Sequence, residues 1–126
     1  MYKPEGYNSV SPYIMANGAQ AVINFLKTVF DANELRRYAR PDGTIMHAEV
    51  KLDDTVVMIA EGSESWPGFP AWIHVYVADV DATYQRALAA GAESAMDPTQ
   101  KDGDDDKRGG VKDPAGNIWW IAQQMG

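Results

Sequence analysis

The sequence contains no cysteine. That absence excludes a disulfide scaffold, a thiolate metal site, a catalytic cysteine and a thiol redox cycle. Basic side chains are also few, with 11 Lys and Arg against 18 Asp and Glu, which gives a formal net charge of −7. Nucleic acid and anionic membranes attract a basic protein face, so we expect neither of them as a partner.

Long hydrophobic runs are absent as well. Charged residues interrupt every apolar stretch before the roughly 18 residues that a membrane span needs, and the first six residues lack the apolar region of a secretory signal. We therefore expect a cytoplasmic location. The length of 126 residues and the hydrophobic content of 45% suit one packed domain, residues 1–126.

Hydrophobic spacing predicts a first module over about residues 9–61. Residues 9–16 alternate as a strand, with Val10 pointing inward, and a helix follows after Asn17, which is a plausible cap. Three strands at 34–40, 45–52 and 55–61 are joined by the turn residues 41–43 and 53–54. The order of elements is β-α-β-β-β.

A second module, about residues 71–124, repeats this order after a connector at 62–70 that contains two prolines and two glycines. Its strand 72–77 precedes a helix at 80–90, which Gly91 closes, and short strands at 93–96, 109–112 and 118–123. Identical pairs recur 61 or 62 positions apart, for example Val50-Lys51 and Val111-Lys112. We therefore expect an α+β fold of two tandem βαβββ modules, derived by duplication.

Strand alternation gives each sheet one face toward its helix and one face turned away, which we call the open face. In the strand 45–52 it predicts that Met46, Ala48, Val50 and Leu52 point inward. The open faces are rich in aromatic residues and methionine and carry few polar groups. Such a face indicates a ligand cleft, and it also suits packing between modules or a dimer contact.

The ordered motifs of the chain resemble those of the vicinal oxygen chelate superfamily, which includes glyoxalase I, bleomycin-resistance proteins and extradiol dioxygenases. The closest resemblance is to the PhnB-like branch. The carriers are Pro12-Tyr13, residues 21–26, residues 41–49, residues 80–82 and residues 108–117. The resemblance implies paired modules whose sheets curve around a cleft, usually in a homodimer, but it does not imply one reaction.

Metal enzymes of the superfamily take ligands from the first and last strands of each module, generally His and Glu. The resemblance places Ser11, Met58, Trp72 and Trp120 at those positions. Three of these side chains cannot bind a divalent ion and a lone serine is a poor ligand, so we expect the family metal site to be lost and no cofactor to be bound. His47, Glu49 and His74 form an alternative two-histidine, one-carboxylate set, and His47 tuned by Glu49 is a candidate catalytic acid or base.

The acidic run Asp102–Asp106 suggests a calcium loop at first sight. Counted from Asp102 it fails the EF-hand pattern, because Lys107 stands where glycine is required. A solvated, mobile loop is the better interpretation, and near a cleft it would attract a cationic ligand.

These observations favour a protein that binds an aromatic or amphipathic small molecule in a metal-free cleft, as in drug sequestration. The predicted ligand-binding residues are Tyr13, Met15, His47, Glu49, Met58, Trp72, His74, Tyr76 and Trp120. One alternative is a metal-dependent or acid/base enzyme of lyase, isomerase or dioxygenase type that uses His47, Glu49 and His74. Another is a structural or regulatory dimer whose aromatic face is wholly interfacial.

Overall fold

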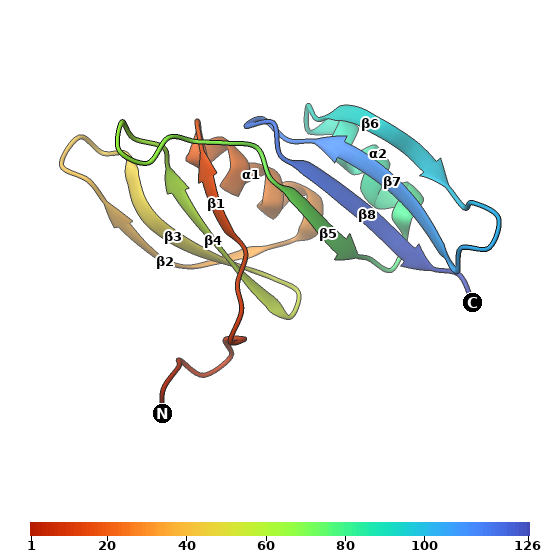
Figure 1. Ribbon diagram of the computed structural model, residues 1–126, viewed down its shortest axis with the longest axis horizontal. Helices are drawn as coiled ribbons and strands as arrows, with labels where there is room; N and C mark the ends of the chain where they lie inside the picture. The colour runs from red at the N-terminus through yellow and green to blue at the C-terminus, as the bar shows by residue number, and fades with distance from the viewer.

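Each half of the chain folds into one four-stranded sheet with one helix packed on it (Figure 1). The computed structural model describes residues 1–126. The first module contains β1 (Tyr13–Ala16), α1 (Ala19–Phe30), β2 (Asn33–Ala39), β3 (Ile45–Leu52) and β4 (Thr55–Glu61). The second contains β5 (Trp72–Tyr76), α2 (Val80–Ala89), β6 (Glu93–Thr99), β7 (Asp106–Lys112) and β8 (Ile118–Gln124). The predicted pair of βαβββ modules is confirmed.

The two sheets share one topology. Their strand orders are β1-β4-β3-β2 and β5-β8-β7-β6, and in each sheet the first strand pairs in parallel with the last. Tyr13 pairs with Met58 in the first sheet, and His74 pairs with Trp120 at the equivalent place in the second. The sheets lie side by side in Figure 1, and one cluster of buried hydrophobic residues includes members from both modules.

The last strand of each module caps the helix of that module. The Glu61 carboxylate accepts hydrogen bonds from the backbone N–H of Gly18, at 3.0 Å, and of Ala19, at 2.9 Å. In the second module Gln123 Oε1 accepts from the backbone N–H at the start of α2, at 3.0 Å. The predicted cap Asn17 is therefore wrong, because α1 begins beside a carboxylate from a distant strand.

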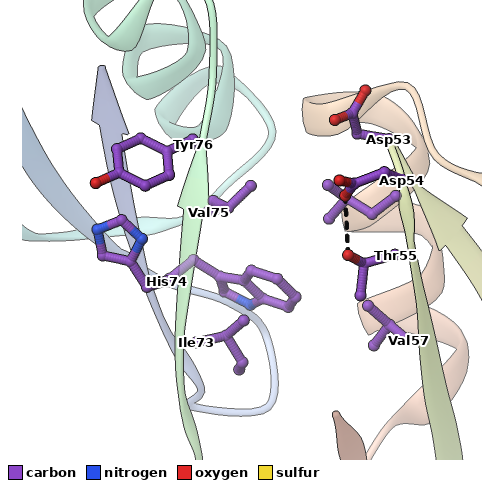
Figure 2. A pocket seen from close by; sticks show the side chains of 10 residues that line it. Asp53, Asp54, Thr55, Val57, Ile73, His74, Val75 and Tyr76 are labelled. Atoms are coloured by element: carbon purple, nitrogen blue, oxygen red, sulfur yellow. Dashed lines mark hydrogen bonds between the residues drawn. The ribbon is translucent and has the colours of Figure 1, made fainter. Parts of the chain in front are cut away.

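Most predicted strand faces are confirmed. Figure 2 shows that Ile73 and Val75 point from β5 toward the first module, while His74 and Tyr76 point the other way. On β8, Trp119 is fully buried, as the alternation predicted. The aromatic side chains of the second module thus lie on the open face.

Two residues that were predicted to point inward are exposed. Met46 is 50% exposed because the β2–β3 register shifts between Tyr38 and Ala39, which leaves Met46 as the extra, unpaired residue of a β-bulge on β3. Val10 is 81% exposed because β1 begins only at Tyr13. Local alternation could not place either residue, since a bulge and a strand end are set by pairing with other strands.

The acidic run is only partly a solvated loop. Asp106 is the first residue of β7 and is 7% exposed. Its carboxylate accepts hydrogen bonds from Tyr76 OH, at 2.7 Å, and from Arg108, at 3.0 Å. The loop prediction was therefore wrong for Asp106, which two partners from the sheet hold in place. Neither α1 nor α2 is long and apolar enough to cross a membrane.

Candidate functional site

The open face of the first module is organised around a buried carboxylate. Glu49 on β3 is 4% exposed and accepts three hydrogen bonds. The donors on Oε1 are Arg36 Nε from β2, at 2.6 Å, and Tyr7 OH from the segment before β1, at 2.5 Å. His47 Nε2 lies 2.8 Å from Oε2. Each oxygen of the buried carboxylate is thus satisfied.

These contacts keep Glu49 ionised. Burial raises its pKa, but the hydrogen bonds from Tyr7, Arg36 and His47 outweigh burial and lower the pKa from 4.5 to about 2. The same bond acts in the opposite sense on its donor, because the hydrogen bond to Glu49 raises the pKa of Tyr7. At neutral pH the pair is therefore a phenol and a carboxylate.

The Glu49 carboxylate selects one tautomer of the neutral His47 ring. Since Nε2 faces an ionised acceptor, the neutral imidazole carries its proton on Nε2, and Nδ1 is left to accept from Tyr13 OH, 3.1 Å away. The result is an ordered chain from Tyr13 through His47 to Glu49. An imidazole oriented by a carboxylate is a typical arrangement of a general base.

The open face of the second module is aromatic. Trp72 is 75% exposed and meets Trp120 edge to face, with ring centroids 5.3 Å apart. The Trp120 ring lies against Gly110 on β7, where a β-carbon would come within 2.6 Å of the ring. Trp120 Nε1 is buried without a hydrogen-bond partner. Glycine at 110 therefore lets a large aromatic surface lie close to the sheet.

A polar cluster borders this aromatic pair. His74 Nε2 accepts a hydrogen bond from Arg108 Nε, at 3.1 Å, while Arg108 forms ion pairs with Asp104 and Asp106, each at 3.0 Å. Burial and the nearby guanidinium lower the pKa of His74, so His74 is a neutral acceptor at pH 7. Its ring meets that of Tyr76 edge to face at 4.9 Å.

The predicted binding residues fall into two sets within one chain. The first sheet and its strands carry Tyr13, Met15, His47, Glu49 and Met58, and the second carries Trp72, His74, Tyr76 and Trp120. Sequence reasoning missed the two further partners of Glu49, Tyr7 and Arg36. Tyr7 stands outside any periodic segment and Arg36 on an exposed strand, so nothing in the sequence marked them.

The side chains at the positions of the family metal ligands do not fit a metal ion. Met58, Trp72 and Trp120 supply no oxygen or imidazole donor, and Ser11 precedes β1. The alternative set is divided, because His47 and Glu49 lie on the first sheet and His74 lies on the second. No group of three or more His, Asp or Glu side chains in the chain has an arrangement that could hold a metal.

A further pocket, of about 260 Å³, lies at the joint between the modules. Ile73 and Val75 of β5 face Val57 and the turn residues Asp53 and Asp54 across it (Figure 2). His74 and Tyr76 point away from the first module in the same view. The pocket lies between β5 and the first module, and although His74 and Tyr76 are among its lining residues, their rings lie on the opposite side of β5.

The comparison with protein families agrees with this fold. Residues 8–121 match the model of the Glyoxalase/Bleomycin resistance protein/Dioxygenase superfamily. The chain belongs to this superfamily.

Three proteins resemble this chain over most of its length. The uncharacterized protein Mb0911c of Mycobacterium bovis is 35% identical over 93% of this chain and 84% of its own length. TioX from Micromonospora sp. ML1 has 24% identity and a TM-score of 0.72, covering 92% of this chain and 95% of that one. The structure of a putative 3-demethylubiquinone-9 3-methyltransferase, PhnB protein, from Bacillus cereus has 15% identity and a TM-score of 0.68, covering 92% of this chain and 99% of that one. The two solved structures share the fold.

Proposed function

We propose that this protein binds an aromatic or amphipathic small molecule on its open faces, without a metal ion, in the manner of drug sequestration. The observation that carries the proposal is the Trp72–Trp120 pair. A tryptophan that is 75% exposed, held edge to face on a second tryptophan, offers a planar ligand a stacking surface. His74 and Tyr76 beside this pair supply polar contacts that orient a ligand.

The same proposal includes a homodimer in the cytoplasm, from the PhnB-like branch of the superfamily. Tyr13 on one sheet is 51% exposed, and Trp72 and Tyr76 on the other are 75% and 61% exposed. These faces belong to two separate sheets of the chain. A second copy that sets its second module against the first module of its partner closes both faces into clefts and covers the apolar surface.

The binding test uses 2-naphthamide, a neutral planar aromatic probe, whose binding is measured by isothermal titration calorimetry. Trp72→Ala should weaken binding at least tenfold and leave thermal unfolding unchanged, because the side chain is mostly exposed. Val10→Ala, which truncates another exposed apolar side chain, is the control. An absence of binding to the wild type, or equal affinity in Trp72→Ala, contradicts the proposal.

The oligomeric state separates binding from a purely interfacial role. Sedimentation should show a dimer for the wild type, and Trp72→Ala should remain a dimer while losing the probe. If the wild type binds no probe and Trp72→Ala dissociates into monomers, the structural dimer is favoured instead.

A second candidate function is acid/base catalysis by His47, which the ordered Tyr13–His47–Glu49 chain favours. Its substrate is a small oxygenated molecule with an acidic proton beside a carbonyl. The wild type should accelerate deuterium exchange at the carbon beside the carbonyl of a simple ketone, measured by NMR in D₂O. This acceleration should be lost in His47→Gln. Arg37→Gln, which replaces a polar side chain outside the Tyr13–His47–Glu49 chain, is the control, and equal loss in both variants would argue against a specific role for His47.

A further inference from the structure

The connector between the modules borders an open pocket of about 520 Å³ on the first sheet. The connector is held in place, because Phe69 N donates to Met15 O of β1 at 3.1 Å and Trp66 N donates to Ser63 Oγ at 3.1 Å. The pocket has a size typical of small-molecule sites. Its main lining residues are Tyr13, Met15, Arg40, Met46, Trp66 and Phe69.

The apolar side chains that line this pocket are exposed. Trp66 is 73% exposed, Phe69 58%, Tyr13 51% and Met46 50%. Met46 reaches this surface because of the β-bulge on β3, and the two connector aromatics come from a segment without regular structure. Several large apolar side chains that converge on one hollow without a protein group to cover them indicate a ligand of similar character.

Arg40 supplies a positive charge to this apolar surface. One Nη donates to Thr44 Oγ1 at 3.2 Å and the other to Glu61 O at 2.9 Å, which fixes the guanidinium. These bonds use two of its five N–H groups, and Arg40 forms no ion pair.

The carboxylates near Arg40 are committed to other donors. The Glu61 side chain caps α1, and Asp42 Oδ1 accepts from the backbone N–H and the hydroxyl of Thr44. The hydrogen bonds from Thr44 are the main cause of the lowered pKa of Asp42, and Arg40 adds a smaller contribution. The guanidinium therefore keeps N–H donors and positive charge for an external acceptor.

We propose that this pocket binds the carboxylate of an aromatic or amphipathic acid, with Arg40 as the anchor and Trp66 and Phe69 as the apolar wall. The proposal rests on the proposed function, since the pocket adjoins Tyr13 on the open face. It narrows the ligand class from aromatic or amphipathic molecules in general to those that carry a carboxylate. A planar guanidinium matches a carboxylate in shape and charge. Because the protein carries a net charge of −7, an anion gains little from long-range attraction, so the apolar part of the ligand must contribute to binding.

The test compares 2-naphthoate with 2-naphthamide, which share a ring system and differ in charge, by calorimetry at pH 7 and about 0.1 M salt. The wild type should bind the acid at least tenfold more tightly than the amide. Arg40→Gln should weaken binding of the acid about ten- to hundredfold, because a charge-assisted hydrogen bond is lost, and should leave the affinity for the amide unchanged. Arg40→Lys should recover part of the affinity for the acid.

Two controls separate this site from general charge effects and from misfolding. Arg37→Gln removes a positive charge from an exposed ion pair with Glu34 on the same strand, and it should change neither affinity. Retained affinity for the amide shows that an Arg40 variant is folded. Trp66→Ala should weaken binding of the acid, since it removes part of the apolar wall, and should leave binding of the amide at the Trp72–Trp120 pair unchanged.

The outcomes distinguish this inference from the proposed function. If the amide binds through Trp72 and the acid binds no more tightly, or if Arg37→Gln equals Arg40→Gln, the carboxylate site is overturned and the proposed function stands. If neither probe binds the wild type, both are overturned. Selective loss of the acid in Arg40→Gln supports the site.

Discussion

Replacement of Glu49 is the sharpest test of the polar network on the first sheet. Glu49→Gln keeps the size of the side chain but removes the charge that Arg36, Tyr7 and His47 stabilise. The glutamine also places an NH₂ group, which cannot accept a hydrogen bond, opposite one of these donors. We expect a loss of stability at neutral pH that disappears in acid.

The size of this effect follows from the pKa of Glu49. A fall from 4.5 to about 2 on folding corresponds to about 3 kcal/mol at neutral pH, at about 1.36 kcal/mol for each pKa unit. Because the folded-state pKa is the lower one, this stability is present above pH 4.5 and is lost as the pH falls from about 4.5 toward 2. Glu49 is buried, so solvent screens the interaction little.

Urea unfolding of the wild type and Glu49→Gln should be measured at pH 7, 5, 4 and the lowest pH at which both fold. The difference in free energy of unfolding should be about 3 kcal/mol at pH 7 and should shrink steadily below pH 4.5. Glu93→Gln, which removes an exposed carboxylate at the start of β6, controls for the change of net charge. A difference that stays constant from pH 7 down to pH 3 would refute the assignment of Glu49 as the ionised centre.

Three further predictions concern stability and are checked by urea unfolding. Gly110→Ala should cost about 1–3 kcal/mol and alter tryptophan fluorescence, because the new methyl group would come within 2.6 Å of the Trp120 ring; an unchanged protein would show that this ring is free to move. Glu61→Ala should cost about 1 kcal/mol by uncapping α1, and Glu61→Gln, which keeps an acceptor, should cost less. Asp53→Gly should be neutral or stabilise by up to about 1 kcal/mol, since Asp53 has a φ of 53°, and a clear loss would mean that its side chain is needed.

Local patterns carried the prediction of the fold. The apolar positions of α1 recur at steps of three and four, and the side chains of β5 alternate between exposed and partly buried, so each of these elements shows the period of its own structure. Gly91 has a φ of 97°, in agreement with its predicted role after α2. The repeat of about 62 residues then joined these elements into two equal modules.

The candidate site was less predictable because its geometry depends on contacts between distant segments. Tyr7 lies 42 positions from Glu49, and Glu61 reaches α1 across a similar separation. Met46 joined the open face through a shift in strand pairing that has no local signature. Trp66 was assigned to a connector on the strength of its neighbouring glycines and prolines, which predict a break in regular structure and say nothing about what the loop packs against.

The comparison of the two modules explains why functional variants of the open faces should fold. Both modules keep the same frame, since their strand orders match and Glu61 and Gln123 cap the two helices in equivalent ways. The open faces differ at equivalent positions, where Tyr13 beside Met58 corresponds to His74 beside Trp120. Because the same sheet and helix arrangement carries such different side chains on its open face, these side chains do not determine that arrangement. Substitutions on these faces should therefore change binding more than folding. Glu49 and Gly110 are the exceptions, because the Glu49 carboxylate is buried and the Trp120 ring packs directly on Gly110.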